Sequence, residues 1–203
     1  MFIGPKFASN EIMNDQLEKI KEFAAKAHEG QWRKFADEPY IKHPVRVMNI
    51  CQRYSQKMSI PAAALLHDVL EDTTVTQAEL NQFLHSVMDN LTASETMKLV
   101  GDMTDIYTKQ QYLQWNRRKR KAMEVERMQK TSPDAQTIKY ADIIDDCLDL
   151  NNAEPDFARL FLFECRALLK AMIDGNNELR QIAIKTVDEC IRNGRRRRER
   201  VVI

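Results

Sequence analysis

The stretch LLHDVLED, residues 65–72, follows the apolar run SIPAAA. In a helix, His67 and Glu71 lie one turn apart on the same face. The same spacing relates Asp68 to Asp72, so the four polar side chains share one sector. Carboxylates are unfavourable at a helix C-terminus, where the helix dipole is negative. We therefore expect either that these groups face water or that a divalent metal ion neutralises them, and the apolar residues before them favour the ion.

The rest of the 203-residue chain has a helical period, and no segment alternates as a strand does. Capping boxes and turn residues indicate helix starts at Asp15–Glu18, Pro44, Ser59–Pro61, Thr76–Glu79, Thr92–Glu95 and Ser132–Pro133. A basic helix is expected over 110–130, and the last two helices are expected to stop near Gly175 and Gly194. The fold class predicted is all-α, a single compact bundle of about eight to ten helices over 1–194, followed by a basic, disordered C-terminal tail over 195–203.

The composition is that of a globular protein with 43% hydrophobic and 30% charged residues. The net charge of +1 gives no overall field that would attract nucleic acid, so any such signal is local. Four cysteines stand far apart without a CxxC pair and indicate reduced thiols, most of them in the core. No signal peptide or membrane-spanning run is visible, so we expect a cytoplasmic protein.

Further ligands for an ion have to come from elsewhere in the chain. His43, in YIKHPV, stands at a loop-to-helix junction from which its side chain can reach a neighbouring helix. For His28 and His85 we favour ordinary hydrogen-bonded helix residues. Four aspartates in the segment KYADIIDDCLDL follow an i, i+3, i+4, i+7 spacing that also fits a solvated acidic stripe: Asp142, Asp145, Asp146 and Asp149. Spacing alone does not choose among them.

Five stretches together resemble a known family: FAAKAHEGQWRK, PYIKHPVRV, AAALLHDVLEDT, NRRKRK and IKYADIIDD. They are similar to the HD-domain phosphohydrolases, and most of all to the hydrolase domain of the RelA/SpoT family, which degrades the alarmones (p)ppGpp. The resemblance extends from about residue 23 to 150. The chain has no room for the synthetase domain of the long enzymes, so it resembles a small alarmone hydrolase of the kind that includes the metazoan SpoT homologue.

The resemblance implies a metal site and two water-handling acids. It implies that one ion, usually Mn²⁺, is held by His43, His67, Asp68 and Asp142. Two imidazoles and two carboxylates suit Mn²⁺ or Fe²⁺. It also implies that Glu71 and Asp72 orient and deprotonate the attacking water. Attack on the ribose 3′-diphosphate then releases pyrophosphate and leaves GDP or GTP.

The resemblance also implies a nucleotide-binding side. Arg33 and Lys34 match the basic pair beside the base, although two solvated loop cations are the alternative, and Trp32 is expected to be a partial core anchor. Of the run 117–121 we choose Arg118 and Lys119 for the phosphates. Asp146 stands where the family carries an Asn near the ribose, so an acceptor-only group replaces an amide. Ile143 and Ile144 replace residues that are often basic and aromatic in these enzymes.

These departures leave two other functions open. One is hydrolysis of a related nucleotide, (p)ppApp or NADPH, on the same fold. The other is an inactive nucleotide-sensing or nucleic-acid-binding regulator, which the arginine-rich runs suggest and the complete set of acids disfavours. We expect a small-molecule nucleotide substrate and neither a membrane nor a nucleic-acid partner. The sequence does not decide whether the chain forms a homo-oligomer.

Overall fold

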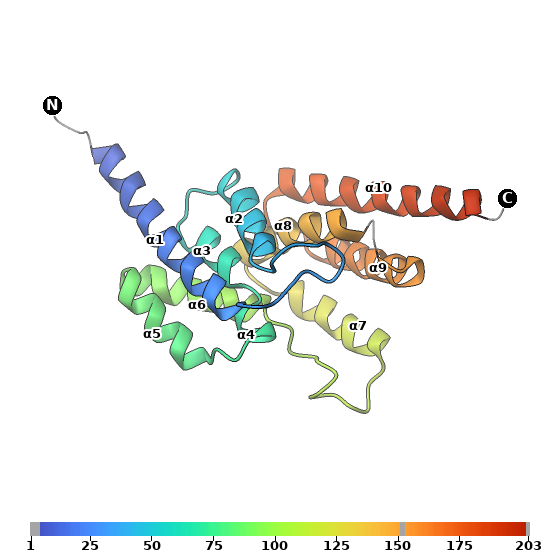
Figure 1. The fold of residues 1–203 in the computed structure, drawn as a ribbon, viewed down its shortest axis with the longest axis horizontal. Helices are drawn as coiled ribbons and strands as arrows, with labels where there is room; N and C mark the ends of the chain where they lie inside the picture. The colour runs from blue at the N-terminus through green and yellow to red at the C-terminus, as the bar shows by residue number, and fades with distance from the viewer. Residues whose placement is uncertain (1–4, 151–152, 202–203) are drawn as a thin grey trace. The chain divides into compact units, whose positions relative to one another are not determined.

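The computed structural model describes residues 5–150 and 153–201, and their regular structure is helical (Figure 1). No strand occurs in these two ranges, so the all-α prediction is confirmed. The chain divides into two compact units, Met1–Gln31 with Pro39–Thr104 and Trp32–Glu38 with Asp105–Ile203. No helix in the described part is long and apolar enough to cross a membrane.

The first unit is built around a short, wholly buried helix, α3. Its helices are α1 (Pro5–Ala27), α2 (Lys42–Gln52), α3 (Ser59–Leu66), α4 (Val69–Asp72), α5 (Gln77–Val87) and α6 (Asn90–Met103). Every residue of α3 is buried, and this helix contacts α1, α2 and α6. The apolar SIPAAALL run is therefore the core of the unit, because each face of α3 is covered by another helix.

The chain bends directly after α3. The sequence predicted one helix through residue 72, but α3 ends at Leu66 and α4 begins at Val69, with His67 and Asp68 in the turn between them. His67 Nδ1 lies 2.8 Å from the carbonyl oxygen of Ala64, an acceptor that a continuing helix would offer to the backbone N–H of Asp68. The single-helix prediction was wrong because this side chain competes for a backbone acceptor.

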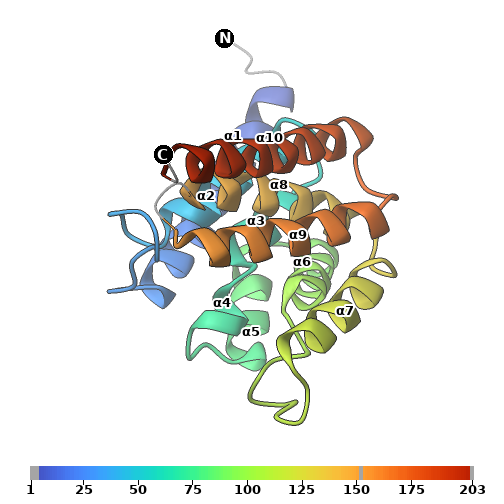
Figure 2. The same cartoon turned by 90° about the vertical axis from the view of Figure 1, so that its right-hand side faces the viewer.

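The second unit contains the remaining helices and the short segment 32–38. Its helices are α7 (Arg117–Met128), α8 (Pro133–Asp149), α9 (Pro155–Ala171) and α10 (Asn177–Val201). Helix α8 contacts α9 and α10, and Figure 2 shows the three side by side. The α9–α10 turn contains Gly175, where an added Cβ would lie 2.6 Å from Tyr140 Cε2 and 2.9 Å from the Thr137 backbone nitrogen. The expected break near Gly175 is therefore confirmed, since only glycine fits this approach to α8.

Two predicted helix starts are confirmed by their caps. Thr76 and Glu79 form the reciprocal capping box at the start of α5. The Ser132 hydroxyl accepts from the Ala135 backbone N–H, and Pro133 opens α8. Both motifs act within four residues, which explains why the sequence alone predicts them.

Three predicted starts were wrong. Asp15 lies inside α1, where its carboxylate accepts from Lys19 Nζ at 2.6 Å instead of capping a helix. Helix α6 is capped by Asp89, whose carboxylate accepts from two backbone N–H groups, and not by Thr92. The basic helix begins at Arg117, capped by Asn116, because the residues before it form turns.

Helix α10 continues through Gly194 to Val201, so the predicted stop at that glycine was wrong. The backbone over 195–201 is helical, and residues 202–203 lie outside the described residues. A domain boundary at residue 194 stays a prediction. The four cysteines are free thiols, and Cys51, Cys147 and Cys165 are buried, as the sequence indicated.

Candidate metal centre

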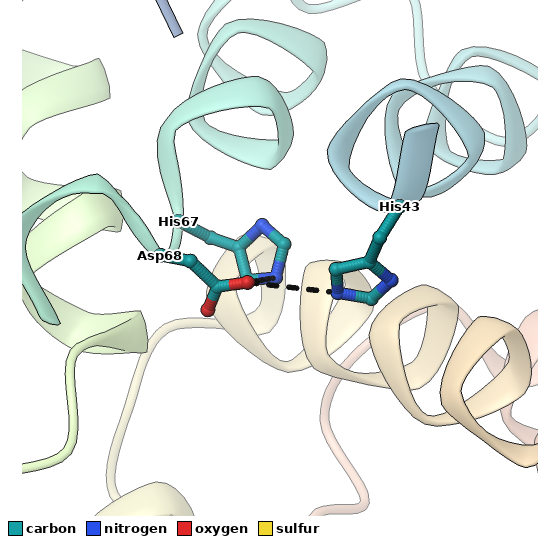
Figure 3. A group of neighbouring side chains, drawn as sticks. All are labelled: His43, His67 and Asp68. Atoms are coloured by element: carbon teal, nitrogen blue, oxygen red, sulfur yellow. Dashed lines mark ion pairs between the residues drawn. The ribbon is translucent and has the colours of Figure 1, made fainter. Parts of the chain in front are cut away.

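His43, His67 and Asp68 converge in the first unit (Figure 3). One ligand atom from each lies within 4.8 Å of the other two. Asp68 Oδ2 is 3.1 Å from His67 Nε2 and 3.6 Å from His43 Nε2. Both imidazoles are almost fully buried, at 1% exposure for His43 and 2% for His67. Two ring nitrogens and one carboxylate oxygen therefore face one small volume.

Backbone contacts orient the His67 ring and hold the backbone of His43. A carbonyl oxygen only accepts, so the contact with Ala64 requires that His67 Nδ1 carries the proton. In a neutral imidazole, the lone pair of His67 is then on Nε2, the atom beside Asp68. His43 stands in the first turn of α2, where its backbone N–H donates to the Tyr40 carbonyl at 3.0 Å. Pro44 follows it and favours the helical backbone at this position.

Tyr40 joins the two aspartates of the α3–α4 turn. Its hydroxyl oxygen is 2.7 Å from Asp68 Oδ2 and 3.0 Å from Asp72 Oδ2. Burial and the negative charge of Asp68 raise the pKa of the Tyr40 phenol above its usual value, so it stays protonated. Desolvation and the charge of Asp68 also raise the pKa of Asp72. The turn thus carries more negative charge than its surroundings readily accommodate.

This donor set fits a divalent transition-metal ion. Neutral imidazole nitrogen and carboxylate oxygen together suit Mn²⁺, Fe²⁺ or Zn²⁺. A metal-bound histidine commonly donates its other ring N–H to a carbonyl, as His67 does to Ala64. Metal binding would also offset the crowding of Asp68 and Asp72. The acidic residues that follow α3 therefore include a candidate metal site, formed by Asp68 with His43 and His67.

The two predicted water-handling acids lie in α4, and the fourth predicted ligand, Asp142, lies in α8. Glu71 and Asp72 follow in α4 with exposed side chains, and their backbone N–H groups both donate to the Asp68 carbonyl. Asp142 belongs to the second unit, where it is 4% exposed and its Oδ2 lies 2.8 Å from Lys139 Nζ. Asp145 is 1% exposed, so the solvated acidic stripe is wrong for these two aspartates. The structure unites three predicted ligands, and the fourth stays a prediction.

Comparison with known proteins places the chain in a family. A family model described as an HD domain matches residues 21–168. The chain belongs to the HD domain family. The human guanosine-3′,5′-bis(diphosphate) 3′-pyrophosphohydrolase MESH1 is 34% identical over 144 residues, 70% of this chain and 73% of the human protein. The mouse protein of the same name is 32% identical over 181 residues, 86% of this chain and 93% of the mouse protein.

A solved structure shows the same fold. A metazoan orthologue of SpoT that hydrolyses ppGpp aligns with a TM-score of 0.70 at 23% identity, over 88% of this chain and 94% of that one. This HD domain protein is therefore homologous to the metazoan SpoT-like ppGpp hydrolases over most of its length. The family predicted from the sequence is confirmed.

In the second unit of the HD domain protein, Arg33 is held by two carboxylates. Its Nε donates to Asp149 Oδ2 at 2.7 Å and its Nη2 donates to Asp146 Oδ1 at 2.8 Å. The Arg33 side chain is only 10% exposed, so the alternative of a solvated loop cation is wrong for this residue. Although burial alone would lower the pKa of Arg33, the hydrogen bonds and charges of both aspartates raise it above its usual value. Asp146, the acceptor-only substitution, thus receives its hydrogen bond from the chain itself.

The neighbours of Arg33 in sequence differ from it. Lys34 is exposed, and its Nζ lies over the Phe157 ring at 4.7 Å and over the Phe35 ring at 5.1 Å from the centroids. Trp32 is 60% exposed, so its prediction as a partial core anchor was wrong. A two-residue basic motif therefore yields one largely buried, ion-paired arginine and one exposed lysine.

The basic run of α7 divides in the same way. Lys119 Nζ lies 4.2 Å from the Trp115 ring centroid, and Arg118 is exposed. Arg117 instead donates to both carboxylate oxygens of Glu164, at 2.8 and 2.7 Å. Of the two residues predicted to bind phosphates, Arg118 is exposed to solvent and Lys119 lies over an aromatic ring. Their role in nucleotide binding stays a prediction.

Sequence analysis missed Tyr40 and Gln31. Gln31 Nε2 donates to the Asp72 carbonyl at 2.8 Å, and its Oε1 lies 2.8 Å from His28 Nδ1. His28 and His85 are hydrogen-bonded through Nδ1, as expected. Tyr40 lies in the PYIKHP motif three residues before His43, and this position was the available signal.

Proposed function

We propose that this protein hydrolyses (p)ppGpp to GDP or GTP and pyrophosphate in a metal-dependent reaction. The observation that carries the proposal is the convergence of His43, His67 and Asp68 on one volume. The human and mouse relatives named for this activity add support, because together they match most of the chain. A small-molecule nucleotide substrate and a cytoplasmic location belong to the same proposal.

The proposed ligands are His43, His67 and Asp68 from the first unit and Asp142 from the second. We propose Mn²⁺ as the natural ion, one per chain, with Fe²⁺ as the other candidate, because the donors are imidazole nitrogens and carboxylate oxygens. Bound there, the ion would acidify a water molecule and withdraw charge from a phosphoryl oxygen. His43 and His67 would contribute buried imidazole nitrogens that already lie close to Asp68.

Glu71 and Asp72 are the proposed water-handling acids. Both backbone N–H groups are anchored on the Asp68 carbonyl, so α4 carries the two carboxylates at a set position relative to the doublet. The exposed Glu71 carboxylate would accept the proton of the attacking water. Asp72, whose pKa is raised and whose Oδ2 contacts Tyr40, would orient that water.

The proposed nucleotide-binding residues lie in the second unit. Arg33, fixed by Asp146 and Asp149, would present its flat guanidinium group to the purine. Lys34 would add a charge, and Arg118 and Lys119 would bind phosphates. Asp146 would accept from a ribose hydroxyl with whatever capacity its ion pair with Arg33 leaves.

The Arg33–Asp146 ion pair also favours a second candidate. Where an amide could donate to the ligand, a carboxylate only accepts, and this difference could redirect the enzyme toward (p)ppApp or NADPH. The same fold and the same metal site would serve these substrates. An inactive regulator is the third outcome to be tested.

The test is incubation of manganese-loaded protein with ppGpp, ppApp and NADPH in separate reactions, followed by chromatographic separation of the products. The proposal expects pyrophosphate and GDP from ppGpp. Free phosphate from NADPH without pyrophosphate would favour the NADPH candidate, and no turnover of any of them would favour the regulator.

A variant separates catalysis from binding. Glu71→Gln should keep Mn²⁺ and nucleotide binding and lower turnover by about 10²–10⁴-fold, the usual contribution of a general base. Glu29→Gln, at another exposed glutamate of the same unit, is the matched control and should leave turnover unchanged. Unchanged turnover in Glu71→Gln would remove Glu71 from the mechanism.

A further inference from the structure

We infer that Tyr40 is a positioning residue that holds the carboxylates of Asp68 and Asp72 as a pair and thereby raises the affinity of the centre for its metal ion. The inference rests on the proposed function in one respect, that a divalent ion binds at His43, His67 and Asp68. Tyr40 itself is not a ligand in this scheme. It acts on the ion through Asp68.

The phenol oxygen stands between the two carboxylates. It lies 2.7 Å from Asp68 Oδ2 and 3.0 Å from Asp72 Oδ2. A phenol has one proton, so it donates to one carboxylate at a time while staying within reach of the other. The shorter distance assigns the proton to Asp68. Because the same Asp68 oxygen is 3.1 Å from His67 Nε2, this hydrogen bond sets how Asp68 faces the two imidazoles.

The Tyr40 ring is itself supported on one face. The His28 ring stacks on it with centroids 4.6 Å apart and an interplanar angle of 26°. His28 is 3% exposed, so this support is nearly closed to water. The Tyr40 backbone N–H also donates to the Gln31 carbonyl at 3.0 Å. Ring and backbone are therefore both held, which gives the hydroxyl one position.

A second connection ties this support to the acidic turn. Gln31 Nε2 donates to the Asp72 carbonyl at 2.8 Å, which orients the amide so that its Oε1 faces His28. His28 Nδ1 is therefore the donor in the 2.8 Å contact with that oxygen. Gln31 thus contacts the Asp72 backbone, and Tyr40 contacts the carboxylates of Asp68 and Asp72. His28 supports both Gln31 and Tyr40.

Tyr40 thus contacts a proposed metal ligand, Asp68, and would influence the ion through it. Hydrogen-bond partners of ligating carboxylates fix their orientation, and their removal commonly weakens metal binding by about 10- to 100-fold. Tyr40→Phe removes the hydroxyl and leaves the ring that stacks on His28. It therefore tests the hydrogen bond with little change in packing.

The experiment measures Mn²⁺ affinity by calorimetry or by electron paramagnetic resonance of free Mn²⁺, without nucleotide. Tyr40→Phe should bind Mn²⁺ about 10- to 100-fold more weakly than the wild type. Tyr54→Phe removes a hydroxyl from another partly exposed tyrosine of the first unit and should bind as the wild type does. Thermal melting of each metal-free variant, recorded in parallel, reports whether it is folded.

Binding by Tyr40→Phe within about twofold of the wild type would overturn the inference, whatever its melting temperature, since a merely structural tyrosine changes stability and not affinity. If Tyr40→Phe does not fold, Gln31→Met decides: weaker Mn²⁺ binding supports the inference and unchanged binding overturns it. A wild-type protein that binds no Mn²⁺ would instead contradict the proposed function, so the two failures are distinguishable.

Discussion

Each unit of the molecule gathers two aspartates around one hydrogen-bond donor. In the first unit, Asp68 and Asp72 approach the hydroxyl of Tyr40 at 2.7 and 3.0 Å. In the second, Asp146 and Asp149 accept from Arg33 at 2.8 and 2.7 Å. The distances are nearly the same, but the donors differ in charge and in number of protons.

The difference supports the proposal of a metal ion beside the Asp68–Asp72 pair. Arg33 brings a positive charge and a separate N–H for each aspartate, so its pair is satisfied within the chain. Tyr40 is neutral and has one proton for two carboxylates. Desolvation and the charge of Asp68 raise the pKa of Asp72, although the hydrogen bond from Tyr40 lowers it. Two buried imidazoles stand beside the Tyr40 pair, ready to share a cation with Asp68. The proposed metal ion would supply the positive charge that Tyr40 lacks and Arg33 provides.

The largest effect is expected from Asp68→Asn. A unit charge about 4 Å from a divalent ion contributes about 8 kcal/mol at an effective dielectric constant of about 20, so Mn²⁺ affinity should fall by more than about a thousandfold. In the wild type, Mn²⁺ at 100 times its dissociation constant should stabilise the fold by about 2.7 kcal/mol. Thermal melting with and without Mn²⁺ measures how much the ion stabilises the wild type and how much it stabilises Asp68→Asn. If Mn²⁺ stabilises Asp68→Asn as much as it stabilises the wild type, the contrast between the two aspartate pairs is wrong.

Arg33→Ala should give the next largest effect, on stability and not on metal binding. It leaves Asp146 and Asp149 without their shared cation, and breaking a largely buried pair costs about 2–4 kcal/mol. Urea denaturation measures the loss. Arg166→Ala is the control, because its contact with Asp188 is 3.7 Å long and its side chain is 59% exposed. Equal stability of the two variants would show that the Arg33 cluster contributes no more than an exposed pair.

The smallest effect concerns a single exposed carboxylate outside both clusters. The backbone N–H of Thr76, and then its hydroxyl, lower the pKa of Glu79 below its ordinary 4.5. A depressed native pKa stabilises the fold above the unfolded-state value, and this stability is lost as the pH falls through the native pKa. The stability difference between wild type and Glu79→Gln should therefore be constant near neutral pH and shrink in acid. Urea denaturation across that range measures it, and a difference independent of pH would contradict the assignment.

Features that depend on neighbouring residues were predicted from the sequence, and contacts between distant residues were missed. The Thr76 and Ser132 caps, the buried α3 and the His67–Asp68 doublet are encoded within a few neighbouring residues. The ion pair of Arg33 with Asp149 joins residues 116 apart, and no local pattern encodes it.

The bend after Leu66 was missed for another reason. The periodicity of LLHDVLED fits a continuous helix, and only the contact of His67 with Ala64 shows why the helix ends. Tyr40 was missed because an aromatic residue in a short polar loop can have many structural roles, and its position alone does not distinguish them. Family motifs carried the metal prediction, but they gave no information about which groups hold the ligands in place.

The segment 32–38 belongs to the second unit although the residues on either side of it belong to the first. As the chain is synthesised from its N-terminus, Arg33 is made 113 and 116 residues before the two aspartates it contacts. The second unit therefore cannot be completed until α8 has left the ribosome, and such distant pairing slows folding. A cut between residues 104 and 105 would leave the segment 32–38 on the N-terminal fragment. The C-terminal fragment would then lack Arg33, so it is not expected to fold by itself.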